Sequence, residues 1–231
     1  MKKYLKTFVS RSPLLYRSWF YTVRSRKDDF VRLPNRGDDL YFDGYPRSGN
    51  TFFAVLIRRL FPGIKFSSHL HTTAGIKIAD KCKVPVFILI RNPADAIVSN
   101  LFRKTSGKML YVNQSIVDDL TFRYTNYYNY VMKNISQLNI LHFDELIHNE
   151  QVLMQALTDT LGLKKHSKNS FKEILKETKE WMRELEKKQD DRVSSFENET
   201  RKIFKQENID LVYSSKYYAD VQNVYDKIKF N

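Results

Sequence analysis

The sequence has very little cysteine and no long hydrophobic run. Its single cysteine, Cys82, excludes a disulfide framework within the chain and is typical of a reducing compartment. No segment approaches the ~20 consecutive apolar residues of a membrane-spanning helix. The basic N-terminus also lacks the uninterrupted apolar stretch of a signal peptide. We therefore expect a cytoplasmic protein with at most peripheral membrane contact, through an N-terminal aromatic cluster of Tyr16, Trp19, Phe20 and Tyr21.

Acidic residues are scarce relative to basic ones. The chain has 39 Lys and Arg against 26 Asp and Glu, which gives a formal net charge of +13. Such an excess favours anionic partners, among them nucleotides, nucleic acids, acidic glycans and lipid headgroups. The basic residues are spread along the chain without a dense run, and no nucleic-acid-binding motif is recognisable, so we expect no specific nucleic-acid partner.

The order of sequence patterns predicts an α/β protein. At 231 residues and 42% hydrophobic content, the chain fits one domain, 1–231, with a core at about 38–165 and a helical C-terminal extension at about 166–231. The alternation of strands and helices predicts a three-layer α/β/α fold with a central, mainly parallel sheet. The expected strands are 40–42, 64–71, 84–90 and 139–143, and the expected helices are 50–60, 74–81, 94–103, 115–134 and 149–161.

Residues 43–52 (DGYPRSGNTF) connect the first expected strand to the first expected helix. A strand, a tight polar loop and a helix form a phosphate site, because backbone N–H groups and the helix dipole both point at the anion. Two glycines and Thr51 have the spacing of a Walker A motif, but Asn50 takes the place of its lysine, and the cation is Arg47. Because NTP hydrolysis needs that lysine, the loop predicts a P-loop-like nucleotide site without NTPase activity.

A second informative segment, residues 90–99 (IRNPADAIVS), follows the buried strand at 84–90. Arg91 leaves the carboxyl end of that strand, and Ser99 follows on the next helix. Two helical turns can bring Ser99 back toward the strand end, where both side chains would share one phosphate. The alternative is an arginine that closes a strand and a solvated helical serine.

Together, the two segments resemble the cofactor signatures of the PAPS-dependent sulfotransferases, in their small bacterial-type form. In that family a Tyr-Pro-Lys-Ser-Gly-Thr-Thr-Trp loop binds the 5′-phosphosulfate of 3′-phosphoadenosine 5′-phosphosulfate (PAPS), and an Arg-Asp-Pro…Ser segment binds its 3′-phosphate. The order, the intervening strand and the Arg-to-Ser spacing match here. The resemblance covers residues 38–165, including 143–146 (FDEL), which is similar to the family's Tyr-Glu-Asp-Leu stretch.

The resemblance implies an enzyme that moves a sulfuryl group from PAPS to a hydroxyl or amine, without a metal. Arg47 stands at the family's lysine, and a cation there would stabilise the leaving phosphate. Phe52 stands at an adenine-stacking tryptophan, although a core phenylalanine is an equal alternative, and for Phe143 core packing is favoured. The implied cofactor-binding residues are Arg47, Ser48, Gly49, Asn50, Thr51, Phe52, Arg91 and Ser99.

The catalytic base implied by the resemblance is a histidine. Residues 67–71 (SSHLH) are similar to the family's Lys-Thr-His-Leu-Pro, which places the base at His69. His71, two residues on and on the same face of an extended strand, is the alternative. The family's lysine before the histidine is replaced by Ser67. Since no cysteine or carboxylate stands nearby at metal-ligand spacing, we expect no metal between the two histidines.

The C-terminal part departs from the family. Residues 163–231 contain no glycine, so the family's Gly-rich loop over the 3′-phosphate is missing. Arg192 and Lys202 are candidates to replace it, with a solvated charged loop as the alternative. The acceptor is open among glycans, lipid headgroups, alcohols and phenols, and the aromatic stretch 124–130 either lines its pocket or packs within a helix. A P-loop small-molecule kinase and a non-catalytic polyanion-binding relative remain as alternative functions.

Overall fold

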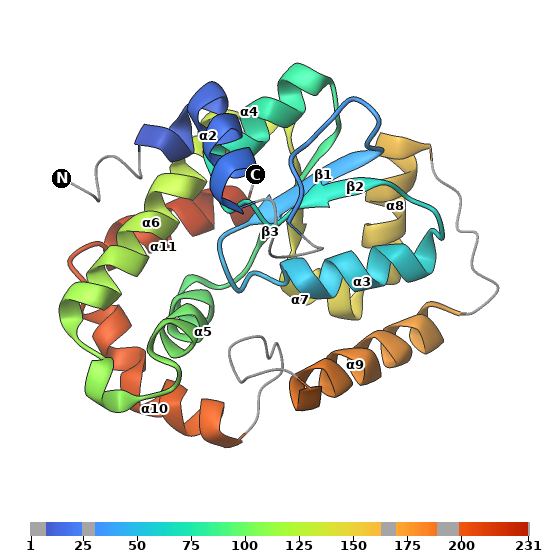
Figure 1. The fold of residues 1–231 in the computed structure, drawn as a ribbon. Helices are drawn as coiled ribbons and strands as arrows, with labels where there is room; N and C mark the ends of the chain where they lie inside the picture. Colours follow the sequence, from blue (N-terminus) through green and yellow to red (C-terminus); the bar gives the residue numbers. More distant parts are fainter. Residues whose placement is uncertain (1–7, 25–30, 163–169, 189–198, 231) are drawn as a thin grey trace.

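The computed structural model describes residues 8–24, 31–162, 170–188 and 199–230. Its centre is a four-stranded, fully parallel sheet in the order β2-β1-β3-β4 (Figure 1). Because all four strands run in the same direction, their carboxyl ends lie along one edge. The strands are β1 (Leu40–Gly44), β2 (Phe66–Ser68), β3 (Val86–Ile90) and β4 (Asn139–His142).

Helices cover both faces of this sheet, as the sequence predicts. One face carries α3 (Asn50–Leu60), α7 (Phe143–His148), α8 (Glu150–Leu161) and α9 (Phe171–Lys188). The other face carries α2 (Pro13–Trp19) with its π-helical continuation Phe20–Arg24, α4 (Thr73–Cys82), α5 (Pro93–Thr105), α6 (Gln114–Lys133), α10 (Glu199–Tyr213) and α11 (Tyr218–Lys229). Two short 3₁₀ turns, Met109–Tyr111 and Ile135–Gln137, precede α6 and β4.

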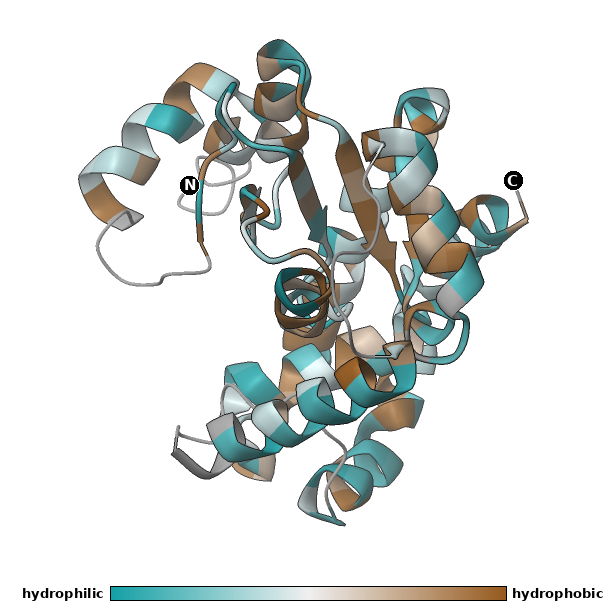
Figure 2. Ribbon diagram, turned by 90° about the vertical axis from the view of Figure 1, so that its right-hand side faces the viewer, coloured by the Kyte–Doolittle hydropathy of each residue, from teal (hydrophilic) through white to brown (hydrophobic). Residues whose placement is uncertain are grey.

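The apolar run of β3 explains how one strand serves two cores. All five of its residues are buried, and they alternate between the two faces. Phe87 and Leu89 pack with α3, whereas Val86, Ile88 and Ile90 pack with α5 and α6. A strand buried on both faces has no polar positions, so the continuous apolar pattern predicts it correctly. Figure 2 shows the same distribution, with hydrophobic residues in the strands and hydrophilic residues on the outer helix surfaces.

Helix α5 begins where its sequence requires. Pro93 occupies the first turn, where a missing N–H costs nothing, and the Asn92 side chain accepts a hydrogen bond from the Asp95 amide at 3.3 Å. Helix α8 ends at Gly162, which adopts the left-handed conformation with φ 62°. These local signals place both helices close to their expected bounds.

Strand β2 is shorter than the sequence predicts. It ends at Ser68, and both His69 (φ 62°) and His71 (φ 53°) adopt left-handed backbone conformations. The two histidines therefore lie in a loop, so the expectation that they share the face of an extended strand is wrong. The His71 amide donates to the Asp43 carboxylate at 2.7 Å, which draws the chain toward the end of β1.

The C-terminal part is helical, as expected, and contributes to both cores. Ile174 and Met182 of α9 are buried against the α3 face, and Phe204 of α10 is buried against α5. Arg192 lies outside the described residues. Within the described ranges, none of the helices has the length and apolar character needed to cross a bilayer.

Candidate functional site

The loop between β1 and α3 opens at the carboxyl edge of the sheet. The chain turns directly after β1, with the Ser48 amide donating to the Tyr45 carbonyl at 3.1 Å. A side chain at Gly44 would collide with the Leu89 carbonyl of β3, so glycine permits the close approach of the two central strands. The loop therefore begins between β1 and β3, where the order of strand connections reverses and where ligands bind in such sheets.

Helix α3 points its amino end at this edge. Gly49 is its N-cap, with φ 93°, and no side chain caps the helix. The first amides of a helix lack intrahelical acceptors, which leaves the N–H groups of Asn50, Thr51 and Phe52 available to another acceptor. An anion is the acceptor that both these N–H groups and the helix dipole favour.

Two arginines from different strand ends converge beside this amino end. Arg47 donates from Nε to the Ser99 Oγ at 2.9 Å, and Arg91 donates from Nη1 to the Arg47 carbonyl at 3.2 Å. Both arginines are half-buried. The two segments that the sequence singles out are thus in direct contact, through the side chain of Arg47 and the side chain of Arg91.

Phe143, the first residue of α7, joins the same cluster. The Arg91 guanidinium lies 5.0 Å from the centre of its ring, and any side chain at Gly49 would collide with that ring. Phe52 meets the ring edge-on at 6.2 Å between centroids. Phe143 packs against the core on the α3 face, which confirms the core packing expected for it, and its half-buried ring also lies against Arg91 and Gly49. Its place directly after β4 is the signal that could have identified it.

The other predicted loop residues turn their side chains inward. Ser48 and Asn50 are buried; the Ser48 Oγ lies 3.3 Å from the Tyr128 hydroxyl, and the Asn50 Nδ2 donates to the Tyr45 carbonyl at 3.4 Å. Phe52 is buried in the core on the α3 face, which fits the core alternative for its side chain. Among the described residues, the buried Oδ1 of Asn50 has no hydrogen-bond partner.

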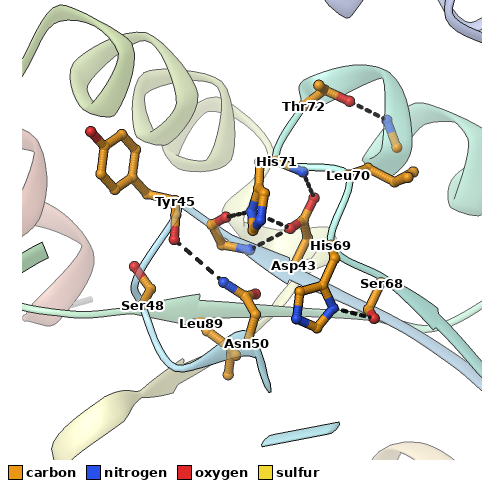
Figure 3. Close-up of polar contacts among 12 residues, drawn as sticks. Asp43, Tyr45, Ser48, Asn50, Ser68, His69, Leu70, His71, Thr72 and Leu89 are labelled. Carbon is orange, nitrogen blue, oxygen red and sulfur yellow. Dashed lines mark hydrogen bonds and ion pairs between the residues drawn. The ribbon is translucent and has the colours of Figure 1, made fainter. Parts of the chain in front are cut away.

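The two histidines lie next to each other at the end of β2, with ring centroids 5.9 Å apart (Figure 3). Nδ1 of His69 lies 2.7 Å from the Ser68 Oγ, and Nε2 of His69 lies 3.2 Å from the Thr51 Oγ1. His71 meets the Gly44 carbonyl at 2.7 Å through Nδ1. Both candidate bases therefore adjoin the β1–α3 loop, one at each end.

Asp43, at the end of β1, is a site residue that sequence reasoning did not single out. Its fully buried carboxylate accepts from the Tyr41 hydroxyl at 2.6 Å and from the Gly44 amide at 2.9 Å, and it lies 3.2 Å from Nδ1 of His71. Burial raises the pKa of Tyr41 well above its usual value, and the Asp43 charge adds to the shift. Tyr41 is therefore a neutral phenol that donates to a buried carboxylate.

The aromatic stretch at 124–130 supports the strand ends from the α6 side. The Tyr124 hydroxyl donates to the Arg91 carbonyl at 2.8 Å, and the Tyr128 hydroxyl donates to the Leu89 carbonyl at 2.6 Å. Burial raises the pKa of both phenols, so both remain donors at neutral pH. These side chains position Arg91 by packing within the fold. This is helix packing, one of the two uses expected for the stretch 124–130, and not the lining of an acceptor pocket.

Helix α10 supplies a cation that pairs with the first turn of α5. Lys205 forms an ion pair of 2.6 Å with Asp95, one helical turn before Ser99. Lys202, a candidate to replace the missing 3′-phosphate loop, is half-exposed and lies 4.0 Å from Glu199. Across the ranges that the structure describes, no group of three or more His, Cys, Asp or Glu could hold a metal.

No family model matches this chain, and no curated protein matches it significantly. Its function therefore has to be argued from the residues at the carboxyl edge of the sheet.

Proposed function

We propose that this protein is a cytoplasmic, PAPS-dependent sulfotransferase with a P-loop-like core. The observation that carries the proposal is the convergence of Arg47, Arg91 and Ser99 beside the amino end of α3. Two guanidinium groups, a hydroxyl and a helix terminus suit a ligand with more than one phosphate. The sequence resemblance to the sulfotransferase signatures then selects PAPS among such nucleotides.

The two ends of the nucleotide would bind to different parts of this cluster. The uncapped N–H groups of α3 and Arg47 would hold the 5′-phosphosulfate, and Arg91 with Ser99 would hold the 3′-phosphate. Arg47 donates a hydrogen bond to Ser99, one of the residues proposed for the 3′-phosphate. Arg47 would therefore move its guanidinium toward the sulfuryl donor when the nucleotide binds.

The chemistry is an in-line transfer that needs no metal. The acceptor oxygen or nitrogen attacks sulfur, and negative charge develops on the 5′-phosphate oxygen that leaves. Arg47 and the α3 amides would stabilise that charge, because both are hydrogen-bond donors at a partly buried site. A histidine at the end of β2 would take the acceptor proton.

A small-molecule kinase on the same scaffold is the first alternative. The position of the Walker lysine is held by Asn50, which is buried and bonded to the Tyr45 carbonyl. This side chain cannot supply a charge to β- and γ-phosphates. Turnover of ATP in the presence of magnesium would favour the kinase over the transferase.

A non-catalytic polyanion-binding protein is the second alternative, and the net charge of +13 is the observation that favours it. Binding of that kind depends strongly on salt and weakly on the chemistry of the ligand. Salt-sensitive binding to heparin or RNA, without transfer from PAPS, would support it.

Calorimetric titration with the product nucleotide, 3′-phosphoadenosine 5′-phosphate (PAP), and with 5′-AMP tests the proposal. A hydrogen bond to a charged group contributes roughly 1.5–3 kcal/mol, so PAP should bind about 10- to 100-fold more tightly than 5′-AMP. Radiolabelled PAPS should then transfer sulfate to a glycan, lipid headgroup, alcohol or phenol. Equal binding of the two nucleotides would contradict the proposal.

A further inference from the structure

The tautomer of the neutral His71 ring is fixed by its surroundings. Its Nδ1 lies 2.7 Å from the Gly44 carbonyl and 3.2 Å from the Asp43 carboxylate, and both of these oxygens only accept hydrogen bonds. Nδ1 must therefore carry a proton, which leaves Nε2 of the neutral ring with its lone pair. Within the described parts of the chain, Nε2 has no hydrogen-bond partner.

Asp43 holds this arrangement in place. A fully buried carboxylate is costly unless its oxygens are satisfied, and here four donors converge on it. Two of the four belong to His71, whose backbone amide donates at 2.7 Å and whose Nδ1 lies at 3.2 Å. The same carboxylate thus fixes both the backbone and the ring of one histidine (Figure 3).

His69 has a different environment. Both of its ring nitrogens face hydroxyl groups, those of Ser68 and Thr51, and a hydroxyl can either donate or accept. Neither partner decides which nitrogen of His69 carries the proton. Its Nε2 is also within hydrogen-bond distance of Thr51, which belongs to the first turn of α3. His69 is therefore placed to support the phosphate loop.

We propose that His71, positioned by Asp43, is the general base of the sulfuryl transfer. This inference depends on the proposed function. The acceptor O–H gives its proton to Nε2 of His71 as the oxygen forms a bond to sulfur. The bond from sulfur to the bridging oxygen of PAPS breaks, and its electron pair stays on the 5′-phosphate of PAP. The products are the sulfated acceptor, PAP and a protonated histidine.

The backbone places this base at the mouth of the loop. His71 has a left-handed conformation, which only a few per cent of residues other than glycine adopt. That conformation brings its ring against Gly44, the last residue of β1, from which the β1–α3 loop departs. The ring thus adjoins the loop proposed to hold the sulfuryl donor, while Nδ1 faces back into the fold.

Kinetics of matched asparagine variants test the assignment, with radiolabelled PAPS as donor and naphthol, hexanol, chitobiose and water as acceptors. In His71→Asn, the amide nitrogen still donates to Gly44, but the base is gone. A general base contributes about 10²- to 10⁴-fold, so kcat should fall by about that factor while the affinity for PAP is unchanged. The control is His148→Asn, at an exposed position in the last turn of α7, which should keep full activity.

Three outcomes separate this inference from the proposed function. If His71→Asn keeps kcat within about tenfold of the wild type while His69→Asn loses it, His71 is not the base and the sulfotransferase proposal stands. If the wild type neither binds PAP nor transfers sulfate, both proposals fail. Loss of kcat in His71→Asn with PAP binding retained supports the inference.

A second measurement needs no acceptor. Long-range ¹H–¹⁵N NMR spectra of the full-length protein report which nitrogen of each neutral histidine is protonated. We expect His71 to be protonated at Nδ1 in the wild type. In Asp43→Asn, we expect a shift in this tautomer ratio and a fall in kcat without loss of PAP affinity. A wild-type His71 protonated at Nε2 would overturn the proposal.

Discussion

At the scale of single residues, Arg91 connects the parts of the site. Its side chain donates to the Arg47 carbonyl and lies over the Phe143 ring, and its own carbonyl accepts from Tyr124. A lysine could keep the charge at this position but not the planar fork that makes both contacts. Arg91 is therefore the residue whose loss should affect nucleotide binding most.

Replacing Arg91 by alanine should weaken PAP binding by about 10- to 100-fold, because a charged hydrogen-bond donor is lost. Arg91→Lys should give an intermediate affinity. The matched control is Arg103→Ala, which removes the same charge from an exposed position in the last turn of α5 and should leave binding unchanged. Calorimetry at constant salt measures the PAP affinity of all three variants. An unchanged affinity in Arg91→Ala would contradict the proposal that Arg91 binds the 3′-phosphate.

Gly49→Ala tests the close packing of the loop against Phe143. Both Gly49 (φ 93°) and Gly63 (φ 90°) have positive φ, but a side chain at Gly63 would meet no atom within 4 Å. The backbone strain is thus similar, and only Gly49→Ala forces Phe143 to move. We expect Gly49→Ala to lower the free energy of unfolding by about 1–3 kcal/mol more than Gly63→Ala does, as measured by urea denaturation. Equal losses would contradict the described packing.

Sequence patterns identified some site residues and missed others for a physical reason. Arg47, Arg91 and Ser99 stand next to strong local signals, a strand end or a helix start, and the structure brings them together. Asp43 and Phe143 also stand at strand ends, but the local sequence does not show which residues they contact. Their roles come from contacts between segments that are far apart in the chain. Asp43 contacts the loop after β2 that carries His71, and Phe143 contacts Gly49 in the β1–α3 loop.

At the scale of secondary structure elements, α10 stabilises the helix that carries Ser99. Phe204 of α10 is buried and meets the Phe102 ring of α5 edge-on, with centroids 5.1 Å apart. Lys205, one residue later, pairs with Asp95 in the first turn of α5. The C-terminal helices therefore contribute to the position of the site, and α10 also carries Lys202, one of the two candidates for the missing 3′-phosphate loop.

Phe204→Ala should destabilise the protein by about 3–5 kcal/mol, since it removes a buried aromatic ring and leaves a cavity. Its neighbour Ile203 is 47% exposed on the same helix, so Ile203→Ala serves as the control and should cost far less. Urea denaturation followed by circular dichroism compares the two variants. Similar losses in both would contradict the packing of α10 on α5.

Element types were predictable here because helices and buried strands have clear periodicity, and helix α3 has the expected bounds. The end of β2 was not predictable from its apparent alternation through residues 64–71. Its residues pair with β1 only over 66–68, and the next turn is set by Asp43 on that neighbouring strand. The separate short helix α7 was likewise not expected, because its first residue was read as the end of a strand.

At the scale of the whole molecule, the sheet order places every proposed ligand at one edge. Strand β1 pairs with β2 on one side and with β3 on the other, so the connections after β1 and β3 leave the sheet toward opposite faces, where ligands bind in such sheets. The net charge of +13 raises the local concentration of anions around the molecule. The carboxyl edge of the sheet should therefore bind the nucleotide specifically. The basic surface should attract anions in general.

Thermal unfolding distinguishes these two contributions. A ligand at 100 times its Kd stabilises the folded state by about 2.7 kcal/mol, which corresponds to a rise in Tm of roughly 5–10 °C for a chain of this size. We expect PAP to produce this rise in the wild type, and at the same concentration a rise of at most about half that size in Arg91→Ala, whose affinity is lower. A rise with heparin alone, lost at high salt, would instead favour polyanion binding.

The most direct test is a crystal structure of the protein with PAP. We predict that the 5′-phosphate contacts the first amides of α3 and that the 3′-phosphate lies between the Arg91 guanidinium and the Ser99 hydroxyl. A nucleotide bound elsewhere, or a 3′-phosphate with no contact to Arg91, would contradict this prediction.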